Sequence, residues 1–259
     1  MSNRHQKIGF KQIVRLEWMD RTLSLVLAGL SEKEIRSNLE EYLSTQRQSG
    51  GEGPIRNKAT FGMSVILLSC WFREEPELDD FRQALIAKAR TMHQKDWLPL
   101  HWALLGASYP FFTVVCEQIG RLFAIQEEIT SGQVYSRMRQ AFGDKEMIRR
   151  NARYVVSSLV SWGLLEISPA GKHGRYVKPK RFVINDSQTS ALLLEGLLLS
   201  IPEERSEWNA LVRNRALYGF DFEFSSIQEL IRQSEDRVEF NQVGLTTTML
   251  SIVPYKEQS

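Results

Sequence analysis

The sequence predicts a mainly α-helical fold that ends in a small α+β region. Three observations lead to this fold class. Apolar residues recur every three or four positions over the first half of the chain, which is the spacing of one helix face. Short helical patterns then alternate with strand-like runs and glycine-containing turns. From residue 187 onward, helical patterns precede alternating, strand-like runs. The expected regions are residues 1–109, 110–186 and 187–259.

The overall composition is that of a globular protein. The chain has 259 residues, of which 42% are hydrophobic and 25% are charged. Its 33 lysines and arginines nearly balance 31 aspartates and glutamates, so the net charge of +2 predicts no partner by itself. Cys70 and Cys116 each lie in an apolar stretch and are expected to be buried thiols. These thiols indicate a reducing compartment, so the expected location is the cytoplasm, and the polar first residues do not resemble a secretory signal.

The first region is expected to be an all-α helical bundle. Ser31 followed by Glu34 has the sequence of a capping box, which starts a helix. A glycine-rich loop is expected over residues 46–54, and a helix over residues 57–72. Pro76 is well placed to open the next helix, because its missing N–H is tolerated in the first turn.

One apolar segment has the length of a membrane span, because no charged residue occurs from Trp97 to Cys116. The step from Tyr109 to Pro110 should break a helix there, since proline removes a backbone donor and clashes with the preceding turn. We therefore expect two buried core helices and no membrane contact.

The second region should contain two short helices followed by two strands. Thr130 or Ser131 is expected to cap the first helix, and Gly143 to end it. Asp144 is expected to cap the second helix, which Gly163 ends. Strands are expected over residues 164–167 and 176–184, joined by a turn over residues 169–174.

This order of elements is typical of a winged helix-turn-helix, and the charge distribution favours one that binds double-stranded DNA. Residues 130–186 carry eleven basic and four acidic side chains, whereas residues 187–259 carry six basic and eleven acidic ones. The second helix of such a motif enters the major groove, where arginine and asparagine suit guanine and adenine edges. The expected DNA-binding residues are Lys145, Arg149, Arg150, Asn151 and Arg153 on the helix, and Lys172, His173, Arg175, Lys178, Lys180 and Arg181 in the wing.

The third region is expected to hold two helices and then strands. The helices should cover residues 191–200 and 203–217. The strand-like runs are residues 220–224, 237–240 and 245–253.

No catalytic constellation emerges from the sequence. It lacks the signature of a phosphate-binding loop and a serine nucleophile elbow. The histidines, His5, His93, His101 and His173, are scattered without metal-ligand spacing. We therefore expect a non-enzymatic protein with no cofactor and no metal, although the dispersed carboxylates of a metal-dependent nuclease would leave no such spacing.

Three short segments resemble the BrxA family of BREX phage-defence systems. They are Leu23 to Ile35 (LSLVLAGLSEKEI), Tyr109 to Phe112 (YPFF) and Leu159 to Leu165 (LVSWGLL), and the resemblance covers roughly the first 185 residues. It implies a DNA-binding accessory protein, encoded beside a methyltransferase, that acts with other antiviral defence proteins. The acidic region after residue 187 departs from the compact family pattern.

Two other functions fit the same elements. A sequence-specific transcriptional regulator would use the same helix and wing but would prefer one site by orders of magnitude. A scaffold would use the winged helix to dock a protein, with Arg149, Arg150 and Arg153 solvating a helix face or pairing with the acidic region. The acidic region itself would either fold over the basic patch as an electrostatic mimic or dock another subunit.

Overall fold

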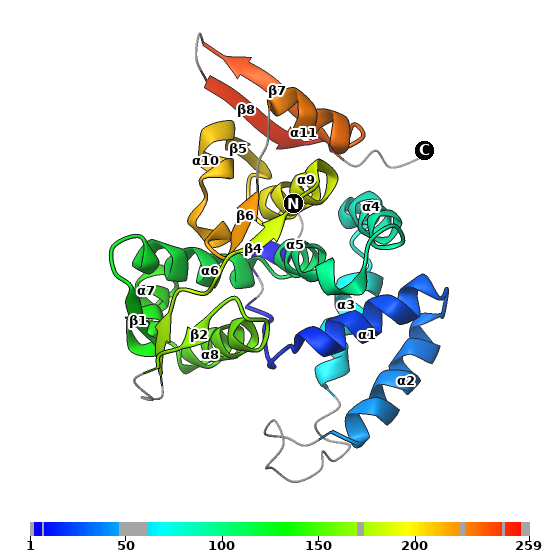
Figure 1. Cartoon of the computed structure of the whole chain (residues 1–259), viewed down its shortest axis with the longest axis vertical. Coiled ribbons are helices and arrows are strands. Elements are labelled where there is room, and N and C mark those ends of the chain that lie inside the picture. Colours follow the sequence, from blue (N-terminus) through cyan, green and yellow to red (C-terminus); the bar gives the residue numbers. More distant parts are fainter. Residues whose placement is uncertain are drawn as a thin grey trace.

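The structure, a computed structural model, is mainly helical, with short strands from residue 128 onward (Figure 1). It describes residues 3–6, 8–46, 62–169, 174–222, 226–244 and 247–254. Within these ranges the strands form three small sheets. The prediction of a mainly α-helical chain with short strands is confirmed.

The N-terminal part is helical, as predicted. Its elements are η1, a 3-10 turn (Asn3–Gln6), α1 (Leu16–Leu27), α2 (Glu32–Ser44), α3 (Met63–Phe72) and α4 (Asp79–Ala89). The capping box at the start of α2 is confirmed, because Ser31 Oγ accepts the Glu34 N–H and the Glu34 carboxylate accepts the Ser31 N–H at 2.8 Å. Pro76 opens a 3-10 turn, η3 (Pro76–Leu78), that leads into α4. The predicted loop from residue 47 onward and the first residues of the predicted helix over 57–72 lie outside the described residues.

Pro110 separates two buried helices. After a 3-10 turn, η4 (Gln94–Asp96), come α5 (Leu98–Ser108) and α6 (Pro110–Phe123), which are bent by 116° relative to each other. Every residue of α5 is buried, so the expected pair of core helices is confirmed. In the described ranges no single helix is long and apolar enough to cross a membrane, and only this bent pair reaches that length and hydropathy together.

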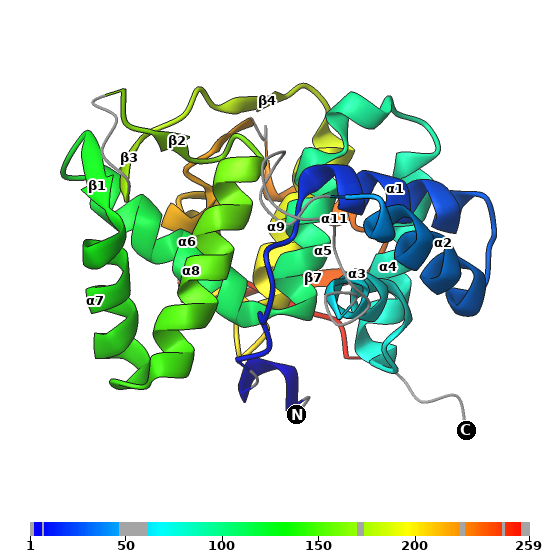
Figure 2. The same ribbon diagram turned by 90° about the horizontal axis from the view of Figure 1, so that it is seen from below.

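Two helices and a three-stranded antiparallel sheet follow α6. The elements are β1 (Glu128–Thr130), α7 (Ser131–Phe142), α8 (Glu146–Ser161), β2 (Glu166–Ile167) and β3 (Arg175–Val177), with β3 between β1 and β2. α7 and α8 lie side by side at one end of the molecule (Figure 2). Thr130 caps α7 in a capping box with Gln133, and Gly143 ends it at a φ of 84°. Asp144 does not cap α8 as predicted, since the N-cap is Lys145 and no side chain accepts there.

The strand predicted over residues 176–184 is wrong, because two strands of different sheets replace it. β3 ends at Val177, and β4 (Phe182–Ile184) pairs in parallel with β6 (Phe220–Phe222). Pro179 lies between them and cannot donate the hydrogen bond that a continuous strand would need. Residues 178–181 thus carry the chain from the α7–α8 unit to the C-terminal region.

The C-terminal region is built on α9 (Ser187–Leu199), which is buried almost all round. A Cβ on Gly196 would lie 2.7 Å from the Cα and the carbonyl oxygen of Ala103, so glycine lets α9 touch α5. The helix predicted over residues 203–217 is broken into a strand, a short helix and a 3-10 turn. These and the remaining elements are β5 (Arg205–Glu207), α10 (Trp208–Val212), η5 (Arg215–Leu217), α11 (Ile227–Gln233), β7 (Val238–Val243) and β8 (Thr247–Ile252), with β8 between β5 and β7.

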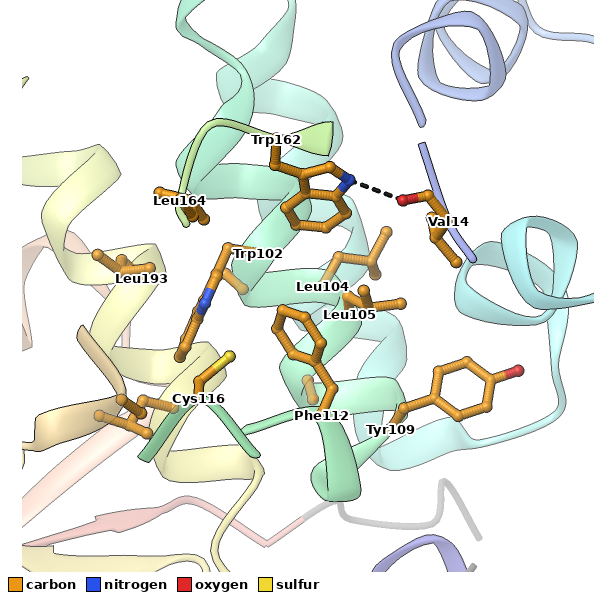
Figure 3. Close-up of a cluster of buried hydrophobic side chains, with 14 of the residues drawn as sticks. Val14, Trp102, Leu104, Leu105, Tyr109, Phe112, Cys116, Trp162, Leu164 and Leu193 are labelled. Atoms are coloured by element: carbon orange, nitrogen blue, oxygen red, sulfur yellow. Dashed lines mark hydrogen bonds between the residues drawn. The ribbon is translucent and has the colours of Figure 1, made fainter. Parts of the chain in front are cut away.

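One continuous apolar core joins the three predicted regions. Its centre is shown in Figure 3, where Trp102 and Phe112 of the α5–α6 pair meet Trp162 from the end of α8 and Leu193 from α9. The ring centroids of Phe112 lie 5.8 Å from Trp102 and 5.9 Å from Trp162. Trp162 Nε1 donates to the Val14 carbonyl oxygen at 2.9 Å, which satisfies the one polar atom of this buried side chain. The C-terminal region therefore shares its interior with the helices that precede it.

Candidate nucleic-acid interface

The position of α8 is fixed by one apolar face. The side chains buried on it recur at three- and four-residue spacing, and they are Ile148, Ala152, Val155, Val156 and Leu159. They pack against α6 and α7. Because this face is sealed in the core, the opposite face of α8 is turned to the outside.

The N-terminal arm, residues 8–15, runs along one side of α8 (Figure 2). Asn151 Nδ2 donates to the Ile8 carbonyl oxygen at 2.8 Å, and the Val14 N–H donates to Ser158 Oγ at 2.9 Å. Asn151 is completely buried beneath the arm. The prediction that Asn151 contacts DNA is therefore wrong, because its amide holds the arm and has no access to a base edge.

Four basic side chains project from the exposed side of α8. They are called the α8 basic face here: Lys145, Arg149, Arg150 and Arg153, all exposed. None of the four forms a salt bridge or a side-chain hydrogen bond with a residue in the described ranges. Arg153 lies over the Tyr154 ring, 5.8 Å from its centroid, and the N–H donors of all four side chains remain available to phosphate oxygens or base edges.

Tyr135 of α7 lies near the arginines of α8, and Tyr176 of β3 lies near Tyr135. Burial is the largest influence on the pKa of Tyr135 and raises it. Tyr176 raises this pKa further, whereas the charges of Arg153 and Arg149 lower it. Burial also raises the pKa of Tyr176 on β3. Both phenols therefore remain neutral near pH 7. Sequence reasoning missed them, because their position depends on how α7 packs against β1, the strand that pairs with β3.

Arg175, one of the predicted wing residues, lies at the start of β3 and is already paired. Arg175 donates to the Glu128 carboxylate at 2.6 Å, and Ser168 Oγ donates to the same carboxylate. Arg175 is thus a partly neutralised cation that ties β3 to β1. Lys172 and His173 lie outside the described residues.

The remaining predicted residues lie beyond the hairpin. Lys178, Lys180 and Arg181 are exposed on the segment between β3 and β4. Lys178 and Arg181 line a cavity between this segment, α6 and α10. Since α6 lies between α8 and α10 (Figure 1), these two side chains do not extend the α8 basic face.

The N-terminal arm adds a cation that sequence reasoning missed. Lys11 is exposed, and it lines the same hollow as Met147 near the start of α8. No local pattern could have revealed this neighbourhood, because it depends on hydrogen bonds between opposite parts of the sequence.

The described residues bring together few groups suited to other chemistry. Among them, no group of three His, Cys, Asp or Glu side chains could hold a metal ion. Cys70 and Cys116 are buried and unbonded, as predicted, and burial raises the pKa of Cys70 to about 12. His101 Nε2 lies 2.9 Å from Asp20 Oδ1 inside the helical part. The α8 surface itself offers positive charge and hydrogen-bond donors.

Comparison with known proteins gives no relative. No protein-family model, curated protein or solved structure matches the chain. The geometry and charge of α8 and its surroundings are therefore the basis for inferring a function.

Proposed function

We propose that the protein binds double-stranded DNA without catalysing a reaction, with α8 in the major groove. The observation that carries the proposal is the exposure of Arg149, Arg150 and Arg153 on one helix, where none of them forms an ion pair or a side-chain hydrogen bond with a described residue. Like charges one turn apart destabilise a helix slightly. A row of DNA phosphates would neutralise this charge and release counterions, which favours binding.

The arrangement around α8 supports a winged helix-turn-helix. α6, β1, α7 and α8 follow one another and lead into the β2–β3 hairpin, whose strand β3 pairs with both β1 and β2. In such a motif the second helix of the pair reads the major groove, and the hairpin loop reaches the phosphate backbone. α8 is the recognition helix in this proposal, and the loop between β2 and β3 is the wing.

The arginines of α8 point toward two sides of the proposed groove. Arg149 and Arg153 are four residues apart and lie near Tyr135 of α7. Arg150 follows Arg149 by one position, so helical geometry turns it away from that side, toward the N-terminal arm. A helix in the major groove can contact base edges below it and phosphates on both walls. Lys145, at the N-terminal end of α8, is suited to a phosphate.

The resemblance to the BrxA family supplies a biological setting, an accessory DNA-binding subunit of a BREX-like phage-defence system. Leu23 to Ile35 spans the α1–α2 turn, Tyr109 to Phe112 the α5–α6 bend, and Leu159 to Leu165 the end of α8. These segments define helix junctions and none carries the α8 basic face. The resemblance therefore supports a shared architecture, and the proposed activity depends on the arginines.

Fluorescence anisotropy with labelled duplexes tests the proposal. The variant R149A/R150A/R153A should lose duplex binding, because three charged contacts are removed. The matched control is R90A/R205A/R232A, which removes three exposed arginines on other elements that are also unpaired in the described ranges. The control should bind like the wild type. Equal affinity of the α8 variant and the wild type would reject α8 as the DNA-binding element.

Competition with random and genomic duplexes separates the biological roles. An accessory binder should show little preference among sequences, whereas a transcriptional regulator should prefer one site by about a thousandfold or more. A protein-docking scaffold should not bind DNA at physiological salt.

A further inference from the structure

A second cationic site lies on the other side of α6 from α8. It is a cavity of about 650 Å³, within the range of small-molecule sites. Its walls are the C-terminal half of α6, the 178–181 segment, α10, η5 and β6. Figure 1 shows these elements gathered on the α10 side of α6. This cavity is called the α6–α10 pocket.

Aromatic rings line the floor of the α6–α10 pocket. The ring centroids of Phe123 and Tyr218 are 5.6 Å apart. Tyr218 Oη donates to the Leu164 carbonyl oxygen at 2.7 Å, so its donor is used and its ring remains as apolar surface. Trp208 and Phe222 also line the cavity, and both are half-buried. Such rings favour a flat partner that stacks on them.

The rim of the pocket carries a surplus of positive charge. Lys178, Arg181, Arg213 and Arg215 line it together with a single carboxylate, that of Asp221. Arg181 is 3.9 Å from this carboxylate. The other three cations are exposed and form no salt bridge with any described residue. This local surplus of positive charge contrasts with the overall charge of the region beyond residue 186, which has six basic and eleven acidic side chains.

The backbone that carries two of the arginines is held in place. A Cβ on Gly120 would lie 1.8 Å from the Arg215 carbonyl oxygen, so only glycine lets η5 rest on α6. Asn214 Oδ1 accepts the Ala216 N–H at 2.9 Å and caps the 3-10 turn. Arg213 and Arg215 therefore extend from a fixed turn, which lowers the cost of ordering them around an anion.

We propose that the α6–α10 pocket binds a nucleoside phosphate, with the phosphate held by Arg213, Arg215 and Lys178. Guanidinium and ammonium groups pair well with phosphate oxygens, and the half-buried rings of Trp208 and Phe222 suit the base. A simple anion would leave the aromatic floor unused, and an apolar ligand would leave three cations unpaired. A free nucleotide and the terminal nucleotide of a nucleic acid strand share this chemistry. The site is separate from the proposed duplex contact of α8.

Isothermal titration calorimetry on the full chain tests this site. The probes are ATP, AMP, adenosine, pyrophosphate and a 5′-phosphorylated single-stranded thymidine oligonucleotide. At least one phosphorylated nucleoside, free or at the strand end, should bind about tenfold more tightly than adenosine and pyrophosphate, because it makes both kinds of contact. The variant R213A/R215A should weaken this binding by about tenfold or more, as expected for lost charged hydrogen bonds. Both arginines are exposed, so the variant should fold, and R90A/R205A is the matched control.

The outcomes are distinct. Binding of the free nucleotides or of the oligonucleotide, each dependent on Arg213 and Arg215, supports the site and identifies the source of its ligand. The proposal is overturned if no phosphorylated nucleoside binds, if pyrophosphate binds as tightly as the nucleotides, or if R213A/R215A retains full affinity. R149A/R150A/R153A should keep nucleotide binding while R213A/R215A keeps duplex binding, so the two proposals fail separately.

Discussion

α8 and α9 differ in the environment of their charged side chains, which are exposed on α8 and buried on α9. α9 is buried almost all round, and its one charged residue, Glu195, receives hydrogen bonds from Arg237 Nε at 2.8 Å and Nη2 at 3.1 Å. α8 buries one face and leaves Arg149, Arg150 and Arg153 exposed, with no ion pair in the described ranges. The ion pair of Glu195 therefore stabilises the fold, whereas the arginines of α8 form no ion pair that would do so.

This difference separates structural charge from charge that a ligand can use. A buried ion pair becomes costly when one partner is removed, because the other remains buried and uncompensated. An exposed cation is well solvated, so removing it changes stability little. Substitutions in the two helices should consequently divide between loss of stability and loss of binding.

The largest effect is expected at the buried pair of α9. Arg237→Ala leaves the Glu195 carboxylate buried without its partner, which should cost about 3 to 5 kcal/mol of unfolding free energy. Urea denaturation measures this loss. Arg232→Ala, an exposed arginine on α11, is the matched control and should stay within about 0.5 kcal/mol of the wild type.

The loss in Arg237→Ala should also depend on pH. Burial raises the pKa of Glu195, and Arg237 lowers it, so the substitution should raise this pKa further. A carboxyl with a raised pKa in the folded state stabilises the protein below its unfolded pKa, about 4.3, and this contribution is lost as the pH rises through the folded pKa. The deficit should therefore be small near pH 4 and complete near pH 8. A deficit that is equal at both pH values would contradict the buried carboxylate.

The next largest effect is expected where α9 touches α5. Gly196→Ala places a Cβ 2.7 Å from the Cα and the carbonyl oxygen of Ala103, so the helices must separate, at a cost of about 1 to 3 kcal/mol. Urea denaturation is again the measurement. Gly62→Ala is the control, because its Cβ would meet nothing within 4 Å. Equal stability of the two variants would mean that α9 and α5 are not in close contact.

A smaller effect is expected at Gly174, at the loop end of the β2–β3 hairpin, where its carbonyl oxygen accepts the N–H of Ser131 at the start of α7 at 2.8 Å. Gly174 has a φ of 79°, and an added Cβ would lie 2.8 Å from Ser131 Oγ. Gly174→Ala should cost about 1 to 2 kcal/mol and weaken binding to all duplexes alike, because the hairpin loses its anchor on α7. Gly132→Ala, where a Cβ makes only an ordinary contact, should be neutral or slightly stabilising. Thermal unfolding and anisotropy measure the two effects, and unchanged values for Gly174→Ala would refute the anchor.

The smallest change in stability is expected for the α8 basic face. R149A/R150A/R153A should keep its unfolding free energy within about 0.5 kcal/mol of the wild type, because none of these side chains holds the fold together. A much larger loss in urea denaturation would show that the arginines are structural, and α8 would then resemble α9.

Local signals in the sequence predicted much of the fold. The capping box at Ser31, the cap at Thr130, the terminator Gly143 and the break at Pro110 all appear at the expected places. Each depends on residues within one turn of the chain, so the sequence contains the whole interaction. The exposure of the basic residues of α8 follows from helical periodicity for the same reason.

Features that depend on contacts between distant parts of the chain could not be predicted from the sequence. Helical spacing places Asn151 beside the apolar stripe, and only the arm bonded at Ile8 explains why it is buried. The pairing of β4 with β6 likewise places Lys178 and Arg181 in the α6–α10 pocket rather than in a wing. Each of these depends on a partner more than thirty residues away in the sequence.

The most direct test of the proposed DNA contact is the salt dependence of duplex binding by the wild type and by R149A/R150A/R153A. Each lost phosphate contact lowers the slope of log K against log salt concentration by about 0.9. We expect salt-sensitive binding by the wild type, and a weaker, shallower dependence in the variant. Identical affinity and slope for the two proteins, or no binding by the wild type at low salt, would contradict the assignment of α8 as the DNA-binding helix.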